Sequence, residues 1–212
     1  ALLEYENFIK NELKKENKQT LIKPLIADIG QSNADADLER LSFIQNSDDL
    51  EILLPLLTPS QCASICHKYR LLIDNSYSLG RILSSLDMAQ FDAVCQALHD
   101  RIPNIILDFQ NLKQVLTQLN PTQLQNFMPY IPQKLAEKFK HFRVTLNLFE
   151  GLDFEQRAVL LENRLTSFPQ MLTKPEELMQ LLNHLNFQDI KQLFQDPGMR
   201  KKIPLLIKTF SN

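Results

Sequence analysis

Glycine and tryptophan are scarce in this 212-residue sequence, which has four glycines and no tryptophan. So few glycines argue against a turn-rich β fold and against a glycine-rich phosphate-binding loop. The sequence also contains no Gly-x-Ser-x-Gly nucleophile motif and no dinucleotide-binding fingerprint. We therefore expect neither catalytic activity nor a cofactor-binding site.

Strong charge bias and long apolar segments are absent as well. The formal net charge of −2 argues against a strongly basic nucleic-acid-binding protein. No apolar run approaches the roughly 20 residues that a membrane-spanning helix needs, and no signal peptide is visible at the amino end. The three cysteines are too few for a disulfide framework, so we expect a soluble protein in a reducing compartment. The first residue is Ala1 rather than methionine, and we expect the sequence to be a fragment of a longer chain.

A short apolar phrase occurs five times and predicts a helical repeat. Its consensus is Leu-x-x-Leu-Leu-x-x-Leu, with Ile, Val, Thr or Phe at some positions. The spacing of the copies is 29 residues once and then 33 residues three times, because their last leucines are Leu57, Leu86, Leu119, Leu152 and Leu185. A fixed period of this size is typical of stacked helical repeats. We predict an all-α protein, a right-handed stack of about five 33-residue helical-hairpin repeats that resembles an α-solenoid.

The residues after each last leucine predict the start of the next helix. A good N-cap residue follows every leucine: Thr58, Asp87, Asn120, Asp153 and Asn186. Three residues further on, four copies have a glutamine and the fifth has Asp189. A glutamine at this N3 position can accept from the amide of the cap residue, so these four copies are predicted capping boxes. Two further caps are predicted, Asp108 before a helix at Leu112, and Thr173 paired with Glu176.

Each repeat is predicted to contain two helices and a short helical linker. The linkers share one form, seen in Ile102-Pro103-x-x-Ile106, in Phe168-Pro169-x-x-Leu172 and, after a two-residue insertion, in Ile203-Pro204-x-x-Ile207. Residues 1–47 are less regular, and terminal units of repeat arrays are often atypical. We predict an irregular helical cap over residues 1–47, continuous with a repeat array over residues 48–212 in a single domain. The alternative for residues 1–47 is the end of a preceding domain.

Cys62, Cys66 and His67 resemble part of a metal site, because cysteines four residues apart share one face of a helix. The other copies of the repeat indicate a different role. Cys66 and Cys95 occupy the same repeat position, where the remaining copies have Met, Leu and Phe. We therefore predict that the cysteines pack in the core. The four histidines fall at four different repeat positions, so we expect no metal site.

Two groups of basic residues are the candidate binding residues. The first group is Lys134, Lys138, Lys140 and Arg143, and the second group is Arg200, Lys201 and Lys202. A solvated helix face would account for both groups. The alternative is a surface that binds an acidic protein, a phosphoinositide or an anionic membrane.

The repeated phrase is similar to Leu-x-x-Ile/Val-Leu-x-x-Leu-Asp/Asn/Ser-x-x-Gln, and this pattern resembles the helical repeat of effector proteins secreted by Legionella and Coxiella. The resemblance covers about residues 48–209. It implies a protein that is delivered into a host cell, where the repeats bind or target a host partner in the cytoplasm or at a membrane surface. It supplies no catalytic residues.

These observations lead to three hypotheses about function. The first is a non-enzymatic binding module that recognises a host or partner protein. The second is an adaptor for anionic lipids, including phosphoinositides, that uses the basic groups of the carboxy-terminal half. The third is an accessory domain of a larger effector enzyme.

Overall fold

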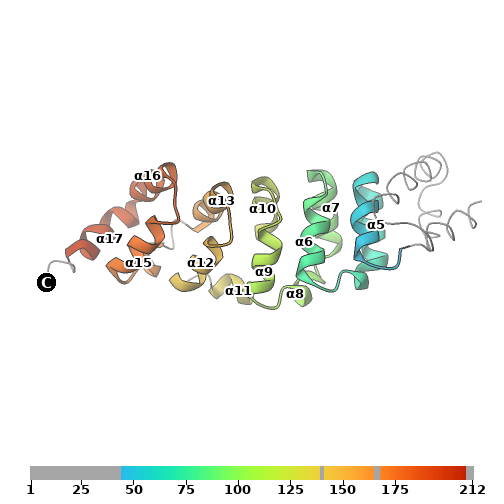
Figure 1. Cartoon of the computed structure of the whole chain (residues 1–212), viewed down its shortest axis with the longest axis horizontal. Coiled ribbons are helices and arrows are strands. Elements are labelled where there is room, and N and C mark those ends of the chain that lie inside the picture. Colours follow the sequence, from blue (N-terminus) through green and yellow to red (C-terminus); the bar gives the residue numbers. More distant parts are fainter. Residues whose placement is uncertain (1–43, 139–140, 165–167, 209–212) are drawn as a thin grey trace, which may run out of the picture. The chain divides into compact units, whose positions relative to one another are not determined.

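The computed structural model describes residues 44–138, 141–164 and 168–208, and its regular elements there are all helices (Figure 1). No strand occurs in these three ranges, which confirms the predicted all-α class. In the same ranges, no helix combines the length and the apolar character needed to cross a membrane. The predicted cap over residues 1–47 stays a prediction, because residues 1–43 lie outside the described part of the chain.

The chain divides into two compact units, unit 1 over residues 1–106 and unit 2 over residues 107–212. The boundary falls where one copy of the repeat ends and the next begins. Ile106 closes the second linker, and Asp108 is the N-cap of the helix that follows. The Asp108 side chain accepts from the Asn111 amide at 2.8 Å, as the sequence predicts.

Unit 1 contains two helix pairs. The first pair is α4 (Ser47–Leu53) and α5 (Pro59–Tyr69), and the second is α6 (Ser76–Ser84) and α7 (Met88–Ala97). The short elements between and after them are η1 (Leu54–Leu56), η2 (Arg70–Leu72) and α8 (Ile102–Ile105). The first helices of the two pairs, α4 and α6, pack against each other. The second helices, α5 and α7, do the same.

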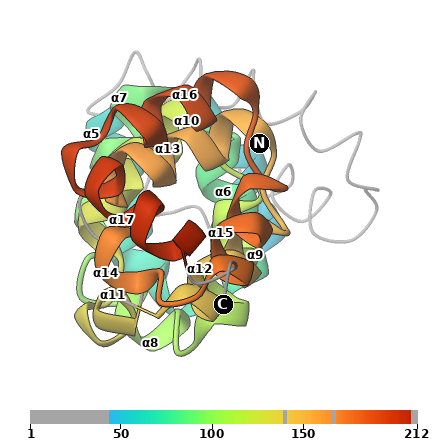
Figure 2. The ribbon, with the colours of Figure 1, turned by 90° about the vertical axis from the view of Figure 1, so that its left-hand side faces the viewer.

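Unit 2 continues the same order of elements. Its first two pairs are α9 (Phe109–Leu116) with α10 (Pro121–Phe127), and α12 (Phe142–Phe149) with α13 (Phe154–Arg164). The third pair is α15 (Pro175–Leu182) with α16 (Phe187–Gln195). The linkers are η3 (Met128–Tyr130), α11 (Gln133–Lys138), α14 (Phe168–Met171) and α17 (Pro197–Lys208). Helix α12 packs against both α9 and α15, α10 packs against α13, and α17 packs against α14 and α16 (Figure 2).

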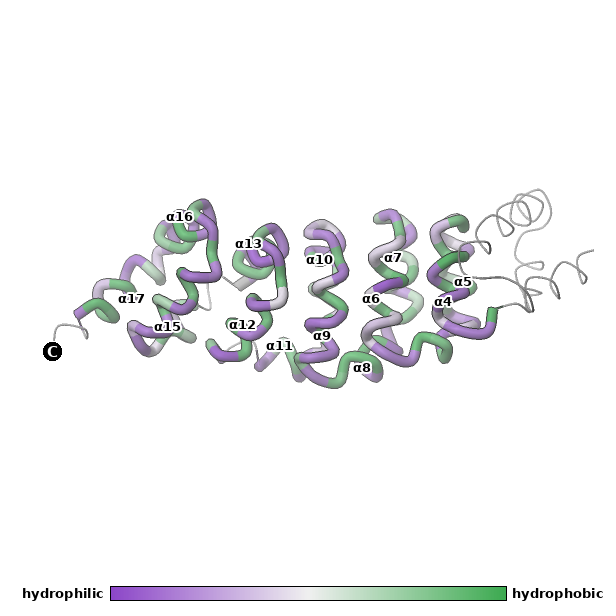
Figure 3. The backbone as a smooth tube through the Cα atoms, viewed as in Figure 1, coloured by the Kyte–Doolittle hydropathy of each residue, from purple (hydrophilic) through white to green (hydrophobic). Residues whose placement is uncertain are grey.

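The repeated apolar phrase forms the core of both units. Its final leucine is buried in all five copies: Leu57, Leu86, Leu119, Leu152 and Leu185. Hydrophobic and hydrophilic residues alternate along each helix (Figure 3), so each helix presents one apolar side to its neighbours. Pro59 and Pro121 lie in the first turn of α5 and α10, where the missing N–H has no helical partner to lose.

The predictions for two local features were wrong. Thr173 does not pair with Glu176, because the N-cap is Lys174 and Pro175 occupies N1. The N3 residue is therefore Glu177, whose carboxylate accepts from the amides of Thr173 at 2.7 Å and Lys174 at 3.0 Å. The Ile203-Pro204 segment is not a separate short linker, since it lies inside the 12-residue helix α17.

Candidate functional site

The most regular polar feature of the chain is the junction between the two helices of each pair. All four predicted capping boxes are present, and the glutamine side chain accepts from the amide of the cap residue at 3.0–3.1 Å in each. The cap side chain in turn accepts from the amide of the glutamine. The fifth copy forms the same reciprocal pair with Asn186 and Asp189. Each junction thus fixes where the second helix begins.

The buried glutamine of a capping box also reaches the preceding repeat. In unit 1, the amide nitrogen Nε2 of Gln90 donates to the carbonyl oxygen of Leu57 at 2.6 Å. The carbonyls of Pro55 and Leu54 lie at 3.3 and 3.4 Å from the same nitrogen. The carbonyls of Leu54 and Pro55 belong to η1, and Leu57 follows it, so Gln90 supplies a donor to the carbonyls that end the first half of the previous pair. One side chain therefore caps the start of its own helix and the end of an earlier one.

Unit 2 repeats this arrangement two copies later, in the fourth copy. The Nε2 atom of Gln156 donates to the carbonyls of Leu119 at 2.7 Å and Leu116 at 3.1 Å. Gln156 is buried, as Gln90 is. A glutamate at this position could accept from the cap amide but could not donate to the carbonyls. The second contact therefore explains why these two buried N3 positions hold glutamine.

The fifth copy lacks this donor because it has Asp189, and Arg157 takes its place. The Arg157 Nε atom donates to the carbonyl of Phe149 at 2.8 Å, and Nη1 donates to the carbonyl of His184 at 2.8 Å. Phe149 lies three residues before Leu152, the last leucine of the fourth copy. Leu54 and Leu116 lie three residues before the last leucines of their own copies, so the three carbonyls occupy the same repeat position. Burial raises the pKa of Asp189, while the amide of Asn186 and the guanidinium of Arg157 oppose that rise.

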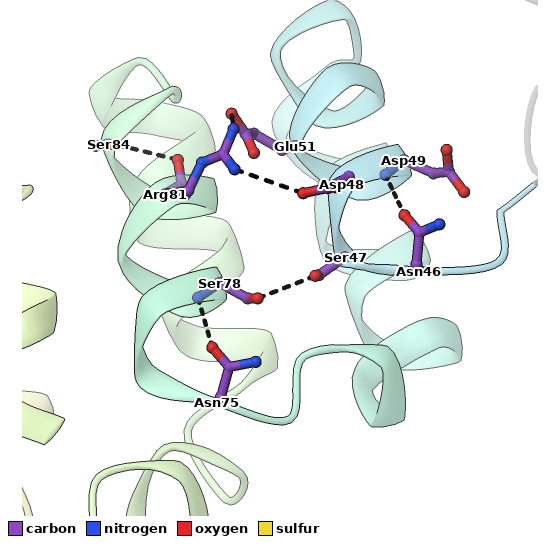
Figure 4. Close-up of polar contacts among 9 residues, drawn as sticks. All are labelled: Asn46, Ser47, Asp48, Asp49, Glu51, Asn75, Ser78, Arg81 and Ser84. Carbon is purple, nitrogen blue, oxygen red and sulfur yellow. Dashed lines mark hydrogen bonds and ion pairs between the residues drawn. The ribbon is translucent and has the colours of Figure 1, made fainter. Parts of the chain in front are cut away.

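A second set of polar contacts joins α4 to α6 (Figure 4). The Arg81 guanidinium donates to the Glu51 carboxylate at 2.6 Å and lies 3.5 Å from the Asp48 carboxylate. The hydrogen bond to Glu51 raises the pKa of Arg81. Beside this ion pair, the Ser47 hydroxyl donates to the Ser78 hydroxyl at 3.0 Å. The polar face of these two helices is therefore occupied by contacts between repeats.

In unit 2, the corresponding first helices use a lysine. The Lys113 Nζ atom on α9 donates to the carbonyl of Asn147 on α12 at 2.9 Å. Its aliphatic chain passes over Gly151, where a Cβ atom would clash with Lys113. Gly151 therefore provides the space that lets Lys113 cross to the next helix.

The cysteines pack in the core, as the repeat positions predict. All three are free and fully buried. Burial, with Asp87 nearby, raises the pKa of Cys62 to about 12, and burial also raises the pKa of Cys66 and of Cys95. The Cys62 thiol donates to the carbonyl of Leu54 at 3.2 Å. Across the described ranges, no group of three or more His, Cys, Asp or Glu side chains is arranged to hold a metal ion.

The structure does not bring the two groups of basic residues together. Lys134 and Lys138 are exposed on α11, and Arg143 is exposed on α12. Lys140 lies outside the described residues. The second group lies on α17, where two of its members, Arg200 and Lys201, are exposed and the third, Lys202, is half-buried. Within unit 2, α11 and α17 are well separated in Figure 1.

Sequence reasoning missed several large apolar side chains that are exposed. Phe154 and Phe187, each the first residue of its helix, are 54% and 77% exposed. On α17, Leu205 is 60% exposed and Ile207 is 53% exposed. A comparison of exposed positions between repeat copies would have found Leu205, because the equivalent residues elsewhere are polar.

The fold and the junctions define the class of protein, an all-α chain built from recurring helix pairs that are linked by buried side-chain hydrogen bonds. Comparisons with protein-family models, with curated proteins and with solved structures found no match.

Proposed function

We propose that this chain is a non-enzymatic helical-repeat module that binds a protein partner. Its helix pairs form a right-handed stack of about five 33-residue repeats, similar to an α-solenoid. The observation that carries the proposal is that the recurring polar side chains form hydrogen bonds between repeats. Gln90 and Gln156 connect one repeat to another, so the recurring chemistry serves shape, and the residues that differ between copies are left for recognition.

The partner-binding residues we favour are Phe154 and Phe187. They occupy the same repeat position, the first residue of the second helix, in successive copies of unit 2. Exposed aromatic side chains are enriched at the centres of protein interfaces and contribute a large share of the binding energy. The Arg157 guanidinium lies over the Phe154 ring at 5.2 Å, which holds the ring in place before a partner arrives.

The resemblance of the repeated phrase to the effectors of Legionella and Coxiella supports a host protein as the partner. Under this proposal, the chain is part of a bacterial effector and acts in the cytoplasm of the host cell. A larger effector enzyme that carries this module as an accessory domain is compatible with the same binding role.

The binding proposal is tested by capture from a eukaryotic lysate with the 212-residue chain as bait, followed by mass spectrometry. The double variant Phe154→Ser/Phe187→Ser should lose the captured protein. Met179→Ser is the matched control, because Met179 is also an exposed apolar residue, at 53%, but lies on a first helix, α15. Equal capture by the wild type and the double variant would exclude this surface. A catalytic activity of the isolated chain would refute the non-enzymatic proposal.

The stacking proposal has its own test, the removal of one whole repeat. Deletion of residues 120–152 joins Leu119 to Asp153 and recreates the junction phrase with Gln156 at N3. In a stack of equivalent repeats, each repeat contacts only its neighbours, so the shortened chain should stay helical and unfold cooperatively. Loss of helical circular dichroism in this variant would contradict the stack.

A further inference from the structure

Helix α17 differs from the other linkers on its exposed side. Its buried side consists of Met199, Ile203 and Leu206, which face the unit through contacts of α17 with α14 and α16 (Figure 2). Lys201, Leu205 and Lys208 follow the spacing i, i+4 and i+7, so they share the opposite side. Both lysines are exposed, and Leu205 is 60% exposed. A large aliphatic side chain therefore stands in solvent between two ammonium groups.

The other repeats show that packing does not require this surface. When Ile203-Pro204 is aligned with Ile102-Pro103 and with Phe168-Pro169, Leu205 corresponds to Asn104 and Gln170. Both of these polar residues are exposed. Ile207 is less distinctive, since its equivalents Ile106 and Leu172 are apolar and buried. Among the equivalent exposed positions, α17 alone has leucine.

The charge of α17 is also of one sign. The helix contains Arg200, Lys201, Lys202 and Lys208, and no acidic residue lies between Pro197 and Lys208. The residues equivalent to Lys201 are Asp100 in the second copy and Thr166 in the fourth. At the Lys201 position the fifth copy alone among these three is basic, whereas Lys202 corresponds to a second basic residue, Arg101, in the second copy.

We propose that α17 docks the chain on an anionic lipid surface, with Leu205 entering the interface between lipid headgroups. A helix with lysines beside exposed aliphatic residues is suited to lie in the plane of such an interface. The lysines and Arg200 contact lipid phosphates, and Leu205 gains a low-polarity environment that solvent does not offer. This role is independent of the protein-binding surface at Phe154 and Phe187.

The basic residues of α11 do not form an equivalent surface. Lys134 and Lys138 are exposed there, but Glu137 lies beside Lys138 and carries the opposite charge. The Gln133 side chain donates to the Glu137 carboxylate at 3.4 Å. The described part of α11 presents no exposed large apolar residue. Helix α11 therefore supplies a matched control with two exposed lysines and no exposed leucine, since its Leu135 is buried.

The test is flotation of the 212-residue chain with vesicles of phosphatidylcholine, with and without phosphatidylserine, at low and high salt. Binding should require phosphatidylserine and weaken at high salt. Lys201→Gln and Lys208→Gln should each lower the vesicle affinity about fivefold. Leu205→Gln should lower it by about fivefold or more, and this change restores the residue of the fourth copy, so it should not unfold the helix. The control Lys134→Gln/Lys138→Gln should bind as the wild type does.

Several outcomes would overturn the proposal. One is a wild-type chain that does not float with phosphatidylserine vesicles at low salt. Another is a Leu205→Gln variant that binds like the wild type while its circular dichroism is unchanged. The acidic polypeptide polyglutamate is the third arm: if it displaces the chain from vesicles and binds it with the same dependence on Leu205, the surface recognises acidic protein and not lipid.

Discussion

The change of Gln90 to glutamate isolates the second role of the N3 side chain. A glutamate can still accept from the amide of Asp87, as the Gln90 carbonyl oxygen does at 3.1 Å. It cannot donate to the carbonyl of Leu57, which now lies 2.6 Å from Nε2. The variant therefore keeps the capping box and loses only the bond to the preceding repeat.

The expected cost of Gln90→Glu is about 3 kcal/mol of the free energy of unfolding at neutral pH. An unsatisfied buried acceptor costs about 1–3 kcal/mol, and the carbonyl of Leu57 would keep only the weak Cys62 thiol donor, whose sulfur lies 3.9 Å away. Gln90 is only 5% exposed, so the new carboxylate would be desolvated and would face carbonyl oxygens of the same partial charge. An uncompensated buried charge costs about 3–5 kcal/mol where a pair is broken, and solvent at the rim of the junction lowers that figure.

Gln61→Glu is the matched control, since Gln61 occupies the same N3 position in α5. Its side chain accepts from the amide of Thr58 at 3.0 Å, and its Nε2 atom donates to no carbonyl of the described residues, unlike that of Gln90. A glutamate there keeps the capping box and places a negative charge in the first turn, which favours the helix. Urea unfolding followed by circular dichroism at 222 nm should give a neutral or slightly stabilised variant. Equal destabilisation by Gln61→Glu and Gln90→Glu would refute the inter-repeat role of the glutamine.

Four further predictions follow from the same structure. Arg157→Leu should lower the free energy of unfolding in urea by about 1–3 kcal/mol. Asp189→Gln should recover part of that loss only in the Arg157→Leu background, because the glutamine supplies the missing donor. Additive effects of the two changes in a double-mutant cycle would contradict the idea that Arg157 replaces the consensus glutamine. The thiol of Cys62, with its pKa raised to about 12, should react with a disulfide reagent far more slowly in the native protein than in urea, as should the other two thiols. Leu119→Ala should cost about 2–5 kcal/mol, because this leucine is 1% exposed, and a near-neutral result would mean that the repeat positions are misassigned. Burial alone would raise the pKa of Glu177, but hydrogen bonds from the Thr173 and Lys174 amides hold that pKa below its usual value. Glu177→Gln should therefore reduce stability at neutral pH, and its difference from the wild type should vanish as the pH falls through the folded pKa of Glu177.

Local signals were sufficient to predict the helix starts. The side chains of Thr58 and Gln61 each accept from the backbone amide of the other residue, and the two residues lie within four positions of each other. This pairing can be predicted without knowledge of the rest of the fold. The core position of Cys66 followed from the residues that replace it in other copies. Repetition thus supplied an internal comparison that distinguished a core residue from a metal ligand.

Contacts across repeats could not be predicted in the same way. The partner of the Gln90 Nε2 atom lies 33 residues away at Leu57, and its identity depends on how two helix pairs pack. A signal was nevertheless present, because a capping box accepts glutamate as readily as glutamine, and four copies use glutamine. The error at Thr173 had a different cause, since Pro175 occupies N1 and moves the cap to Lys174.

Two residues that differ from the repeat consensus, Asp189 and Leu205, differ in whether another residue of the chain makes up for the change. Asp189 departs from the consensus glutamine, and Arg157 restores a donor to the carbonyl of Phe149 at the end of the preceding first helix, α12. That pair of changes preserves the architecture and requires no external ligand. Leu205 departs from the polar residues of its equivalent positions, yet no contact within the described part of unit 2 buries it, since it is 60% exposed. The departure at Asp189 is compensated within the chain by Arg157, whereas the lipid surface proposed for α17 would cover Leu205 from outside the chain.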